Sequence, residues 1–175
     1  MKIIFLDLDG VLNNWYHPEL IDKKNASILK EILKISNAKI VLTSSNKYSF
    51  QREGISSIKG SFLEKYLEVL KTMDIPIYDI TPYVLEDKSE EIKAYLESNP
   101  LITDFVIIDD ELVSMDLRKY QVYLDLYKGL EEKHIKPILD ILRGKRGFYP
   151  DDYNQQETNE QRLKRINRYY NLGKK

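Results

Sequence analysis

Short apolar runs alternate along this chain with segments whose apolar residues recur at helical spacing, and this alternation restricts the fold more than any other feature. It is typical of a parallel sheet whose strands are joined by crossover helices. The sequence therefore predicts an α/β fold, a Rossmann-like parallel sheet with helices on both faces. The expected strands are KIIFLDL at 2–8, AKIVLTS at 38–44, PIYDI at 76–80, DFVIID at 104–109 and KYQVYLDL at 119–126.

Four amphipathic helices are expected around these strands. The first is predicted to begin near Pro18, because proline suits the first turn of a helix. The third is predicted to begin near Asp87 or Lys88, and the last to stop at Gly144. The inward faces are expected to carry Ile28, Leu29, Ile32 and Leu33; Phe62, Leu63, Tyr66, Leu67 and Leu70; Ile92 and Leu96; and Ile135, Ile138, Leu139 and Leu142.

A chain of 175 residues fits one domain with a single core. We expect that domain to span residues 1–145. Residues 146–175 are predicted to form a polar, basic extension, which begins as a linker and contains a short helix around Leu163, Arg165 and Tyr169. Residues 143–175 hold nine Lys or Arg and four Asp or Glu, whereas the chain as a whole has a net charge of −1. A basic tail on an acidic body suggests an anionic partner, although many such tails are only solvated.

The absence of cysteine excludes disulfides, thiolate nucleophiles and Cys-based zinc sites. The first apolar run is too short and too acidic for a signal peptide, and no stretch has the length of a membrane span. We therefore expect a cytoplasmic protein with no membrane partner.

Polar side chains gather where the expected strands end. In an open parallel sheet, ligands bind in the crevice beyond the carboxyl ends of the strands. Carboxylates brought together there repel one another unless a proton or a cation separates them, and oxygen ligands of this kind suit Mg²⁺. Mg²⁺ is therefore the expected cofactor. The side chains in question are Asp7 with Asp9, Thr43 with Ser44, Lys88, and Asp109 with Asp110.

The order of these residues resembles that of the haloacid dehalogenase (HAD) superfamily of phosphohydrolases. FLDLDGVLN resembles its first motif, an apolar strand that ends in Asp-x-Asp, and IVLTSS resembles the second. Lys88 stands where the third motif has a basic residue, and VIIDD resembles the fourth. The resemblance spans roughly residues 1–110.

A narrower resemblance extends to about residue 143. The segments DGVLN, KIVLTSS, ITPY, KSEEI and VIIDD, with a late GL before the last helix, look like the HAD domains associated with RNA-repair proteins. The chain departs from that pattern at Asn46-Lys47, where Trp-Arg is expected, and at Lys88, where Arg is expected.

The resemblance implies a role for each residue. Asp7 would be the nucleophile that forms an aspartyl-phosphate, and Asp9 would act as general acid and base. Thr43, the Ser44 segment and Lys88 would bind the phosphoryl group, with Thr43 and Ser44 both open as the direct contact. The Mg²⁺ ligands would be Asp7, the backbone carbonyl of Asp9, Asp109 and Asp110, the last direct or through water.

The intervals that hold a cap domain in many members of this superfamily are short here. Asp9 to Thr43 holds one loop and one helix, and Ser45 to Lys88 holds one helix, one strand and connections. We therefore expect a capless, open site that takes a phosphorylated substrate large enough to exclude water itself, such as a polynucleotide end. Trp15, Tyr16 and His17 follow the first motif and are candidates to contact such a substrate, although each also suits a plain surface position.

Three other interpretations stay open. One is a small-molecule phosphatase that acts on nucleotides or sugar phosphates. Another is a catalytically weak HAD-like domain that only binds or regulates, since a fold does not guarantee activity. A response-regulator receiver domain also gathers Asp, Thr or Ser and Lys around Mg²⁺, but its motif order differs from the order found here. His134, on the last expected helix, is interpreted as structural.

Overall fold

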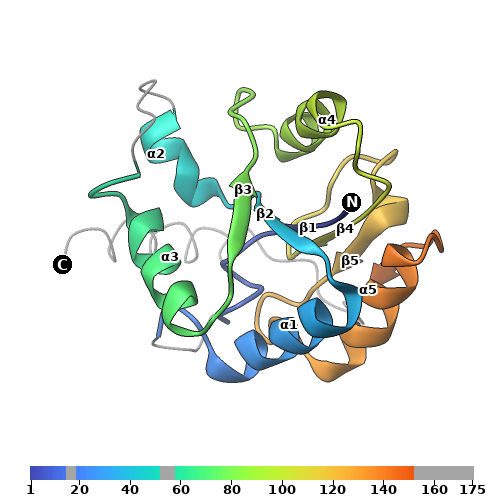
Figure 1. Ribbon diagram of the computed structural model, residues 1–175, viewed down its shortest axis with the longest axis horizontal. Helices are drawn as coiled ribbons and strands as arrows, with labels where there is room; N and C mark the ends of the chain where they lie inside the picture. The colour runs from blue at the N-terminus through green and yellow to red at the C-terminus, as the bar shows by residue number, and fades with distance from the viewer. Residues whose placement is uncertain (15–18, 52–57, 152–175) are drawn as a thin grey trace.

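The computed structural model describes residues 1–14, 19–51 and 58–151. Strands and helices alternate through this range (Figure 1). The strands are β1 (Lys2–Leu6), β2 (Lys39–Leu42), β3 (Ile77–Ile80), β4 (Asp104–Asp109), β5 (Gln121–Tyr123) and β6 (Tyr149–Pro150). The α-helices are α1 (Lys23–Ser36), α2 (Tyr48–Gln51), α3 (Phe62–Thr72), α4 (Lys88–Ser98) and α5 (Ile135–Leu142). Short 3₁₀ helices are η1 (Ser45–Lys47), η2 (Arg118–Tyr120) and η3 (Glu132–His134).

The six strands form one sheet in the order β3-β2-β1-β4-β5-β6, and every pair is parallel. The central strand β1 pairs with β2 on one side and with β4 on the other. Because the strands are parallel, their carboxyl ends lie along one edge of the sheet, where ligands bind in folds of this kind. The predicted α/β fold with a parallel sheet is confirmed.

Helices cover both faces of the sheet, because the inner strands are apolar on both sides. Successive residues of a strand point to opposite faces. Ile4 and Leu6 therefore pack into the larger core, and Ile3 and Phe5 pack into the smaller one. Helices α1, α3 and α5 contribute to the larger core, whereas α4 and the segment around Val113 and Leu117 cover the other face (Figure 1). Within the described residues, no folded cap domain is inserted after β1 or after β2.

The first helix begins later than the sequence predicts. Its first residue is Lys23, and the Asp22 carboxylate accepts a hydrogen bond of 2.7 Å from the Lys24 amide. An aspartate at this position satisfies an amide that has no partner within the helix. Pro18 lies outside the described residues. Helix α4 begins as predicted, with Asp87 as its cap and Lys88 as its first residue.

The sheet extends further along the chain than the sequence indicates. The predicted linker after residue 145 contains β6, which pairs with β5 through Val122 and Tyr123. Asp151 continues this pairing, because its amide donates a hydrogen bond of 2.8 Å to the Tyr123 carbonyl. A strand of two residues is too short for an alternating pattern to predict. The predicted helix around Leu163 lies outside the described residues.

Candidate active site

Three aspartates meet beyond the carboxyl ends of β1 and β4. Asp7 follows β1, and its amide donates a hydrogen bond of 3.1 Å to the Ile108 carbonyl. Asp109 ends β4 beside it, and Asp110 comes next. Each offers a carboxylate oxygen, and these oxygens all lie within 4.8 Å of one another. All three side chains are buried.

Among the described residues, Lys88 carries the only ammonium group that contacts these three carboxylates. Its Nζ lies 2.6 Å from Asp109 Oδ2 and 3.3 Å from Asp7 Oδ2. It also lies 3.7 Å from the more exposed Glu111 Oε2. Burial opposes the charge of Lys88, but the neighbouring carboxylates outweigh burial and hold its pKa well above the usual value. Lys88 therefore carries a permanent positive charge beside Asp7.

One ammonium does not neutralise this group. Burial raises the pKa of Asp7, against the opposing charge of Lys88. Burial also raises the pKa of Asp109 to about 7 and that of Asp110 well above its usual value. Carboxylates with raised pKa values take up protons or a hard cation readily. An all-oxygen donor set of this kind fits Mg²⁺ and does not favour a softer metal.

Asp9 lies outside this group of three, and other side chains hold its carboxylate. The Tyr66 hydroxyl donates to Oδ1 at 2.5 Å, and Asn13 Nδ2 donates to the same oxygen at 2.9 Å. Asn46 Nδ2 donates to Oδ2 at 2.7 Å. Burial, with Asp9 beside it, raises the pKa of Tyr66, so its hydroxyl stays protonated and donates.

The two hydroxyl side chains after β2 differ in their partners. The Thr43 amide donates to the Leu6 carbonyl at 2.9 Å, which fixes Thr43 beside the end of β1. Its Oγ1 is buried and has no hydrogen-bond partner among the described residues. Ser44 Oγ instead accepts from the Asn46 amide at 3.4 Å and from Asn46 Nδ2 at 3.1 Å. A buried hydroxyl without a partner is costly. The Thr43 hydroxyl can therefore gain by forming a hydrogen bond with a ligand, whereas Ser44 Oγ already has partners.

Gly10 gives the chain room to turn beside Asp110. Its φ is +74°, a conformation that other residues adopt only with strain. A Cβ atom at this position would lie 2.5 Å from Asp110 Cγ, well inside van der Waals contact. The loop that follows is fixed by Leu130, whose amide donates to the Val11 carbonyl at 2.9 Å. This contact explains the late Gly-Leu pair in structural terms, since a Cβ at Gly129 would lie 2.7 Å from the same carbonyl.

The structure brings together the predicted residues Asp7, Lys88, Asp109 and Asp110, and it adds four that sequence reasoning missed. Asn13, Asn46 and Tyr66 bind Asp9, and Lys47 forms a fully buried ion pair with Glu91. Asn46-Lys47 was visible only as a departure from the pattern of the RNA-repair domains. Tyr66 was counted as one member of an apolar stripe. Trp15, Tyr16 and His17 lie outside the described residues.

A second cluster, of Glu131, His134 and Asp151, has the residue types of a metal site but the hydrogen bonding of a structural clasp. His134 Nδ1 accepts from the Glu131 amide at 2.9 Å, so the neutral imidazole carries its proton on Nε2. That nitrogen lies 3.3 Å from Asp151 Oδ2 and has no lone pair for a metal. Lys133 Nζ lies between Asp151 and Glu131, at 2.5 and 3.0 Å from their oxygens. His134 is therefore structural, as predicted, although it lies in η3 directly before α5 and not on the last helix itself.

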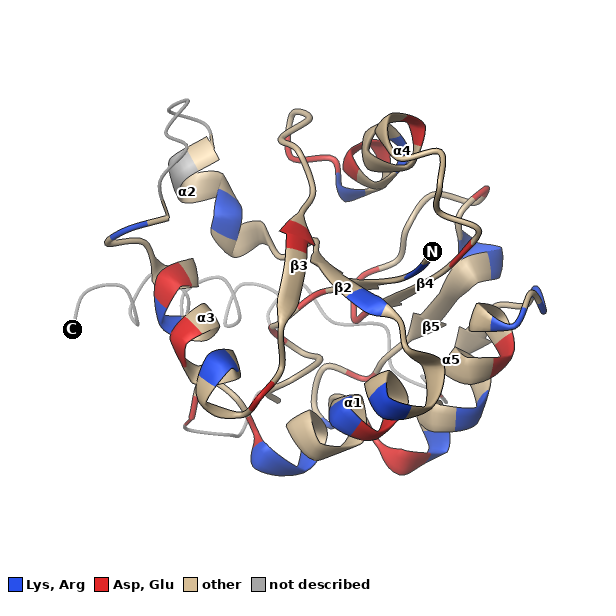
Figure 2. Ribbon diagram, in the orientation of Figure 1, with Lys and Arg blue, Asp and Glu red and all other residues tan. Residues whose placement is uncertain are grey.

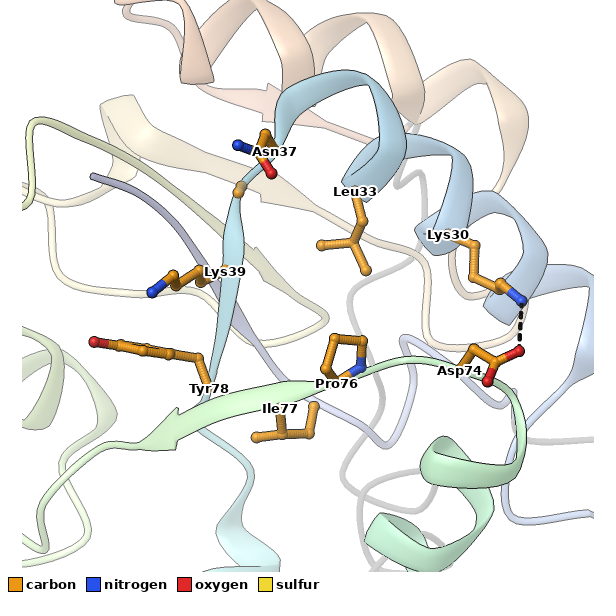
Figure 3. Close-up of a pocket in the computed structure, with 9 residues that line it drawn as sticks. Lys30, Leu33, Asn37, Lys39, Asp74, Pro76, Ile77 and Tyr78 are labelled. Atoms are coloured by element: carbon orange, nitrogen blue, oxygen red, sulfur yellow. Dashed lines mark ion pairs between the residues drawn. The ribbon is translucent and has the colours of Figure 1, made fainter.

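A pocket of about 480 Å³ lies at the amino ends of β2 and β3, at the opposite edge of the sheet from Asp7. Figure 3 shows Lys39 beside Tyr78 at one end of the pocket and the Lys30–Asp74 ion pair at the other. The Lys39 ammonium lies 4.0 Å from the centre of the Tyr78 ring. The lining contains none of Asp7, Asp9, Asp109 and Asp110, so the pocket is not a candidate for the same chemistry.

A family model described as "HAD domain in Swiss Army Knife RNA repair proteins" matches residues 3–135. No curated protein and no solved structure matches the chain. The matched range includes β1 from Ile3 onward, the strands β2 to β5 and every side chain of the site described above. Among the described residues, no helix has the length and apolar character needed to cross a membrane.

Proposed function

Since the chain belongs to the family of HAD domains found in Swiss Army Knife RNA repair proteins, we propose that it is a phosphohydrolase that uses Asp7 as its nucleophile. The observation that carries the proposal is the meeting of Asp7, Asp109 and Asp110 with Lys88 at the carboxyl edge of the sheet. Two carboxylates at the end of a buried strand are costly unless they serve a ligand or a reaction.

The proposed reaction has two steps. An Asp7 carboxylate oxygen attacks phosphorus, the bond from phosphorus to the leaving oxygen breaks, and that oxygen takes a proton from Asp9. Water then gives a proton to Asp9 and attacks the aspartyl-phosphate, which returns the Asp7 carboxylate and releases phosphate. Covalent catalysis of this kind divides one difficult displacement into two easier ones.

Other residues stabilise the transferred group in this proposal. Lys88 offsets negative charge on the phosphoryl oxygens, and the Thr43 hydroxyl donates a hydrogen bond to one of them. Mg²⁺ would be held by Asp7, Asp109, Asp110 and the Asp9 carbonyl, and it would supply further neutralisation of those oxygens.

We infer that the substrate is a phosphorylated polynucleotide end. The family's description names RNA repair, and no cap encloses the crevice within the described residues. An open site excludes water poorly unless the substrate itself covers it.

Phosphate release tests this function directly. The purified protein should hydrolyse 4-nitrophenyl phosphate and oligonucleotides with 5′- or 3′-phosphates in Mg²⁺, and chelation should stop both reactions. Asp7→Asn should lower the rate by at least about 10³-fold, because it removes the attacking oxygen. Asp74→Asn is the matched control, since Asp74 is an exposed residue whose pairing with Lys30 spans 3.9 Å.

Each unexpected result has a definite meaning. Equal activity in Asp7→Asn and the wild-type protein would exclude Asp7 as nucleophile. Metal binding without any hydrolysis would indicate a binding or regulatory domain. A mononucleotide or sugar phosphate that surpasses every oligonucleotide would replace the polynucleotide by a small molecule and leave the phosphatase reaction in place.

A further inference from the structure

Both oxygens of the Asp9 carboxylate accept hydrogen bonds from side chains, and two of the donors, Tyr66 and Asn46, lie far from Asp9 in the sequence. Oδ1 accepts from the Tyr66 hydroxyl at 2.5 Å and from Asn13 at 2.9 Å. Oδ2 accepts from Asn46 at 2.7 Å. The carboxylate therefore has one fixed orientation, which its own position after β1 does not determine.

The partners of the two oxygens differ in how firmly they are held. Tyr66 is 1% exposed, lies in the larger core and packs its ring against Phe62 at 5.4 Å between centroids. Asn13 is tied to its surroundings by a contact of 3.1 Å to the Leu20 carbonyl. Asn46 is partly buried, as Asn13 is, and its side-chain amide also donates to Ser44 Oγ at 3.1 Å. Oδ1 thus accepts two hydrogen bonds, one of them from the core, whereas Oδ2 accepts one from a partly buried side chain.

This asymmetry matters for an acid. A carboxylate oxygen has two lone pairs, and Oδ1 already accepts two hydrogen bonds, whereas Oδ2 accepts one from Asn46 among the described residues. Oδ2 can therefore carry a proton on its second lone pair while it keeps the contact with Asn46. A proton on Oδ1 would displace one of the two donors that hold it.

We propose that Tyr66 and Asn13 are positioning residues that occupy both acceptor positions of Oδ1, so that Oδ2 is the oxygen that transfers protons. The inference rests on the proposed phosphohydrolase function. As Asp7 attacks and the bond to the leaving group breaks, the electron pair stays on the leaving oxygen, which takes the proton from Oδ2. The attacking water later returns a proton to Oδ2.

The dependence of the rate on the leaving group tests this inference. The value of kcat/KM reports the steps through departure of the leaving group, and a general acid matters most when that group is a strong base. Tyr66→Phe removes only the hydroxyl and keeps the ring in the core. Across a series of aryl phosphates in Mg²⁺, we expect kcat/KM of Tyr66→Phe to fall at least about tenfold more for phenyl phosphate than for 4-nitrophenyl phosphate.

Tyr95→Phe is the matched control. Tyr95 is likewise buried, and its hydroxyl donates to the carboxylate of Asp79 at 2.9 Å, in the other core. This variant should change kcat/KM by the same factor for every substrate in the series. Thermal unfolding of both variants separates a loss of folded protein from a loss of catalysis.

A uniform loss in Tyr66→Phe, equal for good and poor leaving groups, would overturn the inference while the phosphohydrolase function stands. A wild-type protein that hydrolyses none of the aryl phosphates would refute the function itself, and the inference with it.

Discussion

Asp109 and Asp110 are buried beside other carboxylates, and Lys88 does not offset all of their negative charge. Burial is the largest cause of the raised pKa of both. Their charge therefore costs free energy in the folded protein at neutral pH. The same cost makes them good ligands, since a divalent cation removes it.

This arrangement predicts an unusual dependence of stability on pH when metal is chelated. A carboxyl group whose pKa is raised on folding binds a proton in the folded protein at a pH where the unfolded chain does not. For Asp109, with a pKa of about 7 against a usual 3.8, this stabilises the fold progressively as pH falls below about 7. Asp110 contributes in the same direction. In Asp110→Asn, the increase in stability as pH falls should be smaller than in the wild-type protein. Thermal unfolding in the presence of a chelator measures this difference.

Over part of the same pH range, His134 changes the stability in the opposite direction to Asp109 and Asp110. Burial lowers its pKa below the usual 6.5. The unfolded chain therefore takes up a proton first as pH falls, and stability decreases below about pH 6.5. Because both proteins contain His134, this contribution cancels when the stability of Asp110→Asn is compared with that of the wild-type protein.

Mg²⁺ should stabilise the fold most at the pH values where Asp109 and Asp110 have lost their protons, because metal and protons compete for the same oxygens. Added Mg²⁺ should raise the Tm more at about pH 8 than at about pH 6. An equal rise at both pH values, or no rise, would contradict binding at Asp7, Asp109 and Asp110.

Much of the site at this scale could be predicted from the sequence. Asp7, Asp109 and Asp110 end strands that alternate with helices, and the match to the HAD domain family confirms the resemblance that their order suggested. The partners of Asp9 could not be predicted. The periodicity that places Tyr66 on a buried helix face says nothing of its hydroxyl, which bonds a residue 57 positions earlier.

At the scale of elements, a fully buried ion pair joins η1 to α4. Lys47 Nζ lies 2.6 Å from Glu91 Oε2, and both side chains are completely inaccessible to solvent. Lys47 also donates to the Pro82 carbonyl at 3.2 Å, and Tyr48 donates to Glu91 at 3.3 Å. The segment after β2 is thereby tied to the helix whose first residue is Lys88.

Breaking this pair should destabilise the protein strongly. Lys47→Met leaves the Glu91 charge buried without its partner, and such changes cost about 3–5 kcal/mol. Urea unfolding would measure the change. Lys47→Met combined with Glu91→Leu should cost less than the two single variants together, because the double variant leaves no unpaired charge.

Lys93→Met is the control, since Lys93 pairs with the exposed carboxylates of Glu90 and Asp116, and its replacement should change stability little. A Lys47→Met protein as stable as this control would show that the buried pair does not hold α4 in place.

Helix positions were more predictable than strand limits. The stripes around Ile28 and Leu63 identify α1 and α3, because burial of an apolar face imposes helical spacing. The start of α1 was wrong, since Asp22 rather than the turn at Pro18 caps the helix. β6 was missed because Tyr149–Pro150 is held by pairing with β5 and not by any local pattern.

At the scale of the whole molecule, parallel pairing determines where the C-terminal segment leaves the domain. β6 runs parallel to the other strands, so it ends at the edge of the sheet that carries Asp7 and Asp109. Asp151 is buried there, and its Oδ2 accepts from the Asp125 amide at 3.1 Å. The described surface carries both charge signs on its helices (Figure 2), whereas residues 152–175 contain six Lys or Arg and three Asp or Glu.

This placement predicts a substrate-specific effect of truncation. Deletion of residues 152–175 keeps Asp151 and should lower kcat/KM for a phosphorylated oligonucleotide by about tenfold at low salt. Hydrolysis of 4-nitrophenyl phosphate should be unaffected. The difference should shrink as salt increases, since contacts to phosphates release counterions.

Replacing Arg162, Lys164, Arg165 and Arg168 by Gln in the full-length chain is the control for charge alone, and it should reproduce the truncation. An equal loss for the oligonucleotide and the aryl phosphate would instead assign the segment a structural role.

The covalent intermediate tests the central claim most directly. Asp9→Asn should slow hydrolysis of the aspartyl-phosphate more than its formation from 4-nitrophenyl phosphate, whose leaving group needs little help from an acid. Acid quenching of this variant during turnover, followed by borohydride reduction and peptide mass spectrometry, locates the phosphorylated residue. The account predicts modification of Asp7 and none in the Asp7→Asn, Asp9→Asn double variant. A phosphoryl group on any other residue, or turnover that continues when Asp7 is replaced, would contradict it.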